Sequence, residues 1–337
     1  MPHRKPRAKS VRSYWAAALA ACALLPLLGC AQRNPTSAPV DLERRALNLL
    51  ERAARDELDV LRANALEALV RTSPGGASVY ALEALTAPEP LVRFAGCAAI
   101  VELREPAARG TVRKLLADPD PRVRLGAAAA AYQLGDRAQA RVLLDTLNND
   151  KDENLRSDAA YLLGRFGEPS AAQHLRLAVR RESSSKVRTH IYTALATLGD
   201  EDGRIELVRT LIENNPISRL IAMQSLAELR LDLAVEPLQY RLRQEGDYMQ
   251  VRLLAARALG RQGRADGYDL ALSSLDRTGD TPDETMRLRS LAALALGQIG
   301  DKRALPRLAR LAETETDPRT QIAACYAILQ ISRPAAR

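Results

Sequence analysis

The sequence predicts an all-α fold in which about nine short helical hairpins stack into a solenoid. One sequence unit recurs nine times, at spacings of 31 to 37 residues. Each copy places small and apolar residues at helical spacing, and the chain is 47% hydrophobic but only 4% aromatic, which suits closely packed helices. A fixed period of this length indicates one supersecondary unit that stacks on its neighbours, so the repeat decides the fold class.

The first helix of each unit begins near an arginine that we call the anchor. In the clearest copy, the anchor Arg124 is followed by Ala127, Ala131 and Gly135 at three, seven and eleven positions. The first two spacings lie on one face of a helix, and glycine ends the helix because it accepts the left-handed conformation. Gln321 takes the anchor position in the ninth unit, and the anchor arginines are Arg62, Arg93, Arg124, Arg156, Arg188, Arg219, Arg252 and Arg289.

A second helix follows each of these stops. After Gly167, for example, Ala171, Leu175 and Val179 come four, eight and twelve positions later, which is again one helical stripe. A single hairpin cannot bury its apolar face alone, so the units are expected to stack. The ninth unit is expected to have only a first helix.

The unit [Val/Leu]-Arg-x-x-Ala-Ala-x-x-Leu-Gly-x-x-Gly-Asp, with a second helix of the form Ala-x-x-x-Leu-x-x-x-Leu, resembles the short HEAT-type repeat. It is most similar to the phycobilisome-lyase variety. The resemblance implies a right-handed α-solenoid over residues 56–334. It also implies that the anchor arginines form a structural ladder on acceptors of neighbouring turns, where Asp118 and Asp150 are available; the alternative is a phosphate-binding row.

Residues 1–29 have the organisation of an export signal. A basic start is followed by an uncharged apolar stretch from Tyr14 to Leu28, which is too short to span a membrane. The stretch ends in Leu27-Leu28-Gly29-Cys30, which resembles the bacterial lipobox and implies lipidation of the Cys30 thiol and cleavage before it. We therefore expect a membrane-anchored lipoprotein facing the periplasm, and the absence of Asp after Cys30 favours the outer membrane. The alternative is an ordinary secretory signal or an uncleaved anchor.

Two further segments precede the repeats. Residues 30–40 are polar and contain proline, so they are expected to form a flexible tether. Residues 41–55 carry an apolar helical face and have no partner hairpin before them. We interpret them as a capping helix that covers the exposed N-terminal end of the solenoid.

The remaining cysteines and histidines indicate no metal site, cofactor or catalytic group. Cys97 and Cys325 lie where other units have alanine, and a separation of seven units puts them on the order of 60 Å apart, too far for a disulfide. We expect both to be buried and unpaired. His174 and His190 stand alone, without the His-Glu pairs of HEAT-repeat diiron hydroxylases or any ligand spacing for zinc.

Charge argues against nucleic acid. The formal net charge is +8, but five basic residues lie in the export signal, which leaves 44 basic against 41 acidic residues, or +3.

The second helices carry a candidate surface for a partner protein. The resemblance implies that these helices line the concave side, and their outward positions in the fourth to sixth units combine apolar residues with arginines, as binding surfaces do. A shift of one residue in the helices would instead bury both isoleucines. The candidate residues are Gln173, Arg180, Ile205, Arg209, Ile212, Tyr240 and Arg243.

We accordingly predict a non-enzymatic scaffold that binds another protein of the bacterial envelope. One alternative is a lyase-like or chaperone-like protein that holds a small ligand. A second, nucleic-acid-binding alternative is disfavoured by export and charge.

Overall fold

The structure, a computed structural model, describes residues 37–165, 167, 170–213 and 215–333. These residues form 18 α-helices, a few short 3₁₀ turns and no strand, so the predicted all-α solenoid is confirmed. The lipidation site Cys30, the export signal and the start of the tether lie outside the described residues.

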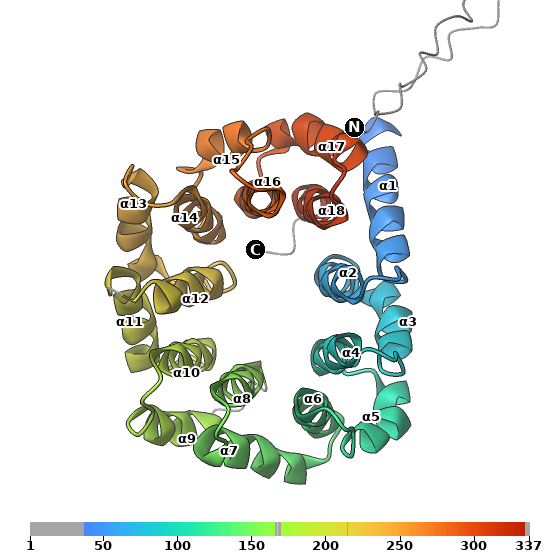
Figure 1. The fold of residues 1–337 in the computed structure, drawn as a ribbon, viewed down its shortest axis with the longest axis vertical. Helices are drawn as coiled ribbons and strands as arrows, with labels where there is room; N and C mark the ends of the chain where they lie inside the picture. The colour runs from blue at the N-terminus through green and yellow to red at the C-terminus, as the bar shows by residue number, and fades with distance from the viewer. Residues whose placement is uncertain (1–36, 166, 168–169, 214, 334–337) are drawn as a thin grey trace, which may run out of the picture.

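The helices form two concentric layers around a ring (Figure 1). The inner layer contains the predicted first helices, which are α2 (Asp59–Thr72), α4 (Pro90–Leu103), α6 (Pro121–Gln133), α8 (Glu153–Arg165), α10 (Ser185–Thr197), α12 (Pro216–Leu226), α14 (Met249–Arg261), α16 (Pro282–Ile299) and α18 (Pro318–Ser332). The outer layer is α1 (Ser37–Ala53), α3 (Pro74–Ala84), α5 (Arg109–Leu115), α7 (Ala140–Asn149), α9 (Ser170–Val179), α11 (Glu201–Arg209), α13 (Val235–Arg243), α15 (Tyr268–Ser274) and α17 (Leu305–Thr314).

Local signals set the bounds of the inner helices. At the start of α6, the Asp120 side chain accepts hydrogen bonds from the backbone N–H groups of Arg122 and Val123, and Pro121 occupies the first turn. At the other end, the glycines predicted to stop these helices all have positive φ, for instance 78° at Gly300. Glycine is suited to these positions because a side chain disfavours this conformation.

The first helices lie inside the ring, so the expectation that the second helices line the concave side is wrong (Figure 1). The reason is the size of the residues between neighbouring inner helices. A Cβ atom on Gly164 would lie 2.7 Å from Ala194 Cα, and one on Gly297 would lie 2.7 Å from Ala327 Cα. Since small residues let the inner helices approach more closely than the leucine-bearing outer helices, the stack curves toward the inner layer.

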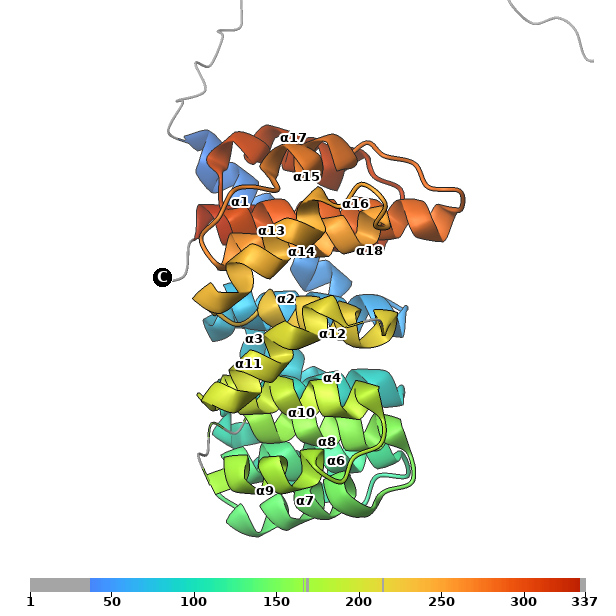
Figure 2. The same cartoon turned by 90° about the vertical axis from the view of Figure 1, so that its left-hand side faces the viewer.

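This curvature closes the chain on itself. Helix α18 packs against α2, and α1 packs against both α18 and α2. In the outer layer α1 lies between α17 and α3 (Figure 1). Helix α1 therefore takes the place of the second helix that the ninth unit lacks, and it does not cap the end of an open stack as the sequence suggested. Figure 2 shows α1 beside α17 at one end of the longest axis.

Ring closure also corrects the expected separation of the two cysteines. Cys97 lies on α4 and Cys325 on α18, and α2 is the only inner helix that separates α4 from α18 around the described part of the ring. A separation on the order of 60 Å applies to an open stack and not to a closed ring. Both thiols are buried and free, and burial raises the pKa of each to about 12.

Candidate binding surfaces

The anchor arginines connect successive turns along one rim of the ring. Arg156 Nε and Nη2 donate to the Glu182 carboxylate at 2.8 and 3.1 Å, and its Nη1 donates to the carbonyl oxygen of Asp150 at 2.8 Å. Arg93 repeats the pattern with Asp118 at 2.8 and 2.9 Å and with the Ala87 carbonyl at 3.0 Å. The hydrogen bonds with Glu182 are the main factor that raises the pKa of Arg156.

The other anchor positions bond to turns in the same way. Arg62 pairs with Glu89, Arg219 with Asp247 and Arg289 with Glu315, while Arg124, Arg188 and Arg252 donate to the carbonyl oxygens of Asp118, Glu182 and Leu242. Gln321, the substitute anchor, donates to the carbonyl oxygen of Glu315. These donors therefore link one unit to the next.

The seven residues singled out from the predicted second helices are all exposed, and they lie on outer-layer helices or directly after them: Gln173, Arg180, Ile205, Arg209, Ile212, Tyr240 and Arg243. Ile212 exposes 61% and Tyr240 53% of its surface, so the helix shift that would bury the isoleucines does not occur. Leu177 on α9 is also exposed and extends the set. It occupies the tenth position after the stop Gly167, as Arg209 does after Gly199, and this spacing was sufficient to find it.

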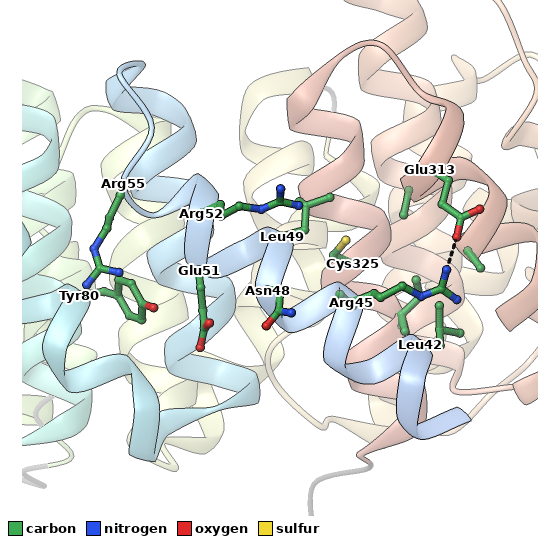
Figure 3. A pocket seen from close by; sticks show the side chains of 14 residues that line it. Leu42, Arg45, Asn48, Leu49, Glu51, Arg52, Arg55, Tyr80, Glu313 and Cys325 are labelled. Carbon is green, nitrogen blue, oxygen red and sulfur yellow. Dashed lines mark hydrogen bonds and ion pairs between the residues drawn. The ribbon is translucent and has the colours of Figure 1, made fainter. Parts of the chain in front are cut away.

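A groove of about 870 Å³ runs along the seam where α1 meets α17 and α18 (Figure 3). Its apolar surface comes from both ends of the chain: Leu42, Ala46, Leu49, Ala309, Ala312, Cys325 and Ile328. Arg45 crosses the groove to Glu313, and Arg55 lies over the ring of Tyr80 at 4.6 Å from its centroid. The sequence did not reveal this groove because its two walls come from opposite ends of the chain.

Ion pairs cross the interior of the ring. Arg71 of α2 pairs with Glu228, which follows α12, and Arg165 of α8 pairs with Glu102 of α4, so both pairs cross between separate parts of the inner layer. Arg257 of α14 reaches the same Glu228 at 3.2 Å. Burial by itself raises the pKa of Glu228, but the charge and hydrogen bond of Arg71 outweigh it and hold that pKa below its ordinary value. These ion pairs therefore bridge the lumen.

The described residues contain no group of three or more His, Cys, Asp or Glu side chains able to hold a metal ion. Within the same part of the chain, no helix is long and apolar enough to cross a membrane.

Paired helices, a shared apolar interior and a ladder of turn-bonding side chains define the chain as a repeat protein of the α-solenoid class. The sequence matches the family model of HEAT repeats over residues 78–163, 140–227 and 235–329, which is more than half of the chain. The chain therefore belongs to the HEAT-repeat family. No curated protein matches the sequence.

Solved structures of low sequence identity are similar to parts of this chain. The complex of CpcE and CpcF of phycocyanin lyase from Nostoc sp. PCC7120 is 18% identical, with 81% of this chain and 100% of that chain covered and a TM-score of 0.42. Human deoxyhypusine hydroxylase is 18% identical, with 78% and 98% covered and a TM-score of 0.37. Kap121p is 12% identical, with 83% of this chain and 37% of that chain covered and a TM-score of 0.36.

Proposed function

We propose that this HEAT-repeat ring is a lipid-anchored scaffold of the bacterial envelope that binds another protein through its outer face. The proposed anchor is the lipid on Cys30, and the proposed location is the periplasmic side of a membrane, with the outer membrane favoured. The proposed role is binding and not catalysis.

The observation that carries the proposal is the concentration of exposed apolar side chains on one part of the outer layer. From α9 to α13, Leu177, Ile205, Ile212, Leu233 and Tyr240 are all exposed. Arginines Arg180, Arg209 and Arg243 lie exposed in the same part of the outer layer. Apolar surface bordered by arginine is typical of protein interfaces, where Arg and Tyr often dominate the binding energy.

The ion pairs in the lumen support a binding surface on the outside of the ring, and they argue against a partner protein enclosed by the ring. An open HEAT solenoid can hold a partner inside its curve, but here the Arg71–Glu228 and Arg165–Glu102 pairs occupy the interior. A folded partner is therefore expected to bind outside the ring.

Replacement of Cys30 by Ser tests the anchor. Acyl chains contribute about 0.8 kcal/mol for each buried CH₂ group, and two or more chains hold a protein stably on a membrane. The wild-type chain should sediment with membranes after a high-salt wash, while a Cys30→Ser chain whose residues 1–29 are replaced by an ordinary cleavable secretory signal should remain soluble. Sedimentation of both chains would refute the lipid anchor.

The double substitution Arg209→Glu with Tyr240→Ala tests the outer face. Both side chains are exposed, so the fold should be retained, and a partner recovered by crosslinking to the wild-type chain should be lost. A matched control is Arg141→Glu with Lys114→Ala, which changes exposed residues of the outer layer in other units. Equal recovery with both double variants would place the interface elsewhere.

A further inference from the structure

Two cavities inside the ring meet at the cross-ring ion pairs. One has a volume of about 290 Å³ and is lined by α2, α4 and α8. The other has a volume of about 550 Å³ and is lined by α2, α8, α10, α12 and α14. Glu67, Arg71, Tyr161 and Arg165 line both cavities, so these four side chains form the boundary between them.

The smaller cavity has an apolar wall and a charged end. Its wall is formed by Ala63, Leu66, Val70, Leu91, Phe94, Ala95, Ala98 and Ala99. The alanines keep the space open, because a larger side chain at Ala95 or Ala98 would enter it. The charged end holds Arg71 and Arg165 with Glu67 and Glu102. A mainly apolar cavity with a few convergent polar groups is the usual form of a small-molecule site, and this volume is at the lower end of the range for such sites.

Tyr161, the aromatic residue at the charged end, faces the cavity and is not packed in the core. Tyr161 exposes 39% of its surface although it lies on an inner helix. The Arg165 guanidinium lies 5.9 Å from the centroid of the Tyr161 ring. An arginine over an aromatic ring beside an apolar wall can hold a flat apolar body and an anionic group at the same time.

Arg165 can hold more than one anionic partner, because a guanidinium has five N–H donors. Burial is the main factor that lowers the pKa of Arg165, the positive charge of Arg71 lowers it further, and the negative charges of Glu228 and Glu67 act in the opposite direction. Arg71 is engaged with Glu228 and Glu67, and Glu102 is the partner of Arg165. A single carboxylate uses at most two of the five guanidinium donors, so an anionic group of a ligand can bind Arg165 beside Glu102.

We propose that the smaller lumen cavity binds a small organic anion, with its apolar body on the Phe94, Ala95 and Ala98 wall and its anionic group on Arg165. This inference is independent of the lipid anchor and of the outer protein-binding face. The ligand class is an amphipathic molecule with one carboxylate or sulfonate and a compact hydrocarbon or aromatic body.

A fluorescent aromatic sulfonate, 8-anilinonaphthalene-1-sulfonate, tests the proposal by titration. All arms use residues 30–337 with Cys30→Ser, made without the export signal, so that neither lipid, detergent nor the apolar stretch Tyr14–Leu28 competes for the probe. Ala98→Phe fills the lumen cavity and should weaken binding at least about tenfold. The matched control Ala309→Phe narrows the seam groove, which is also apolar, and should leave the affinity unchanged.

Arg165→Met removes the cation and should weaken binding of the sulfonate at least about tenfold. The uncharged analogue N-phenyl-1-naphthylamine should bind the parent chain more weakly than the sulfonate and should be insensitive to Arg165→Met. If Ala98→Phe does not fold, as judged by circular dichroism, the Arg165→Met pair of titrations decides the matter.

Three results would overturn the proposal. The first is unchanged affinity for the sulfonate in a folded Ala98→Phe chain or in the Arg165→Met chain. The second is loss of binding in Ala309→Phe, which would place the probe in the seam groove. The third is equal affinity of the parent chain for the charged and uncharged probes.

Discussion

Arg45 Nη1 donates to Glu313 Oε1 at 2.7 Å and thereby joins α1 to α17 across 268 residues of sequence. Arg333, at the end of α18, likewise donates to Glu43 near the start of α1 at 2.9 Å. These contacts bring the two ends of the described chain together. The ring is therefore closed by a ninth hairpin whose two helices come from opposite ends of the sequence.

Packing, and not these exposed ion pairs, is expected to hold the seam. Leu50 of α1 is 0% exposed within the core, while Leu58 in the turn that follows is 60% exposed. We expect Leu50→Ala to lower the free energy of unfolding by about 2–5 kcal/mol because it leaves a cavity. Leu58→Ala, the control, should change it by less than about 0.5 kcal/mol. Urea unfolding measures both, and equal values would mean that α1 is not packed in the ring.

A circular permutant should restore a continuous ninth hairpin. In this chain residues 37–55 follow Arg333 through a short flexible linker, and the new start is Asp56. Because Arg333 already contacts Glu43, the linker has a short gap to cross, and permutation is generally tolerated where chain ends lie close together. We expect native helical content by circular dichroism and a free energy of unfolding within about 1 kcal/mol of the parent chain. A chain without residues 37–55 is the control, and a permutant that is no more stable than this control would contradict the split hairpin.

The anchor ladder should contribute to stability in proportion to its burial. Arg156 and Glu182 are both largely buried and joined by two hydrogen bonds. Arg156→Ala leaves the Glu182 carboxylate without that partner, and we expect a loss of about 3–5 kcal/mol in urea unfolding. Arg180→Ala changes an exposed arginine of the outer layer and should cost less than about 0.5 kcal/mol. Similar losses for both would show that the ladder is not structural.

The same pair predicts a pH dependence of stability. Burial raises the pKa of Glu182, but hydrogen bonds from Arg156 and from the backbone N–H of Ser184 outweigh it, so the pKa in the folded state lies below the ordinary value. The ionised carboxylate therefore stabilises the fold above the unfolded-state pKa of about 4.3, and this contribution is lost as pH falls through the lower folded-state pKa.

Glu182→Gln tests the sign. The wild-type chain should exceed the variant in free energy of unfolding at pH 7, and the difference should shrink below about pH 4. Glu315 and Asp118 also have lowered pKa values and remain in both chains, so the difference isolates Glu182. A difference that stays constant from pH 7 to about pH 3 would contradict the assignment.

The sequence by itself determined the repeating unit. Local spacing places Ala127 and Ala131 on one helix face, and Gly135 adopts the positive φ that ends the helix. These features depend on residues within a dozen positions of each other, so the helical hairpins and their family could be predicted without a structure. The helical period also predicted that Ile212 and Tyr240 are exposed, but only the structure excluded the one-residue shift that would have buried Ile212.

Only the tertiary structure decided how the units are arranged. Which helix layer faces the inside of the ring depends on small differences in helix spacing that add up over every unit. A pattern of neighbouring residues does not predict the summed difference. Closure by α1, the seam groove around Arg45 and Glu313, and the ion pair between Arg71 and Glu228 all join residues that are far apart in sequence. They exist because the accumulated curvature brings the first and last helices together, and that curvature is a property of the whole ring.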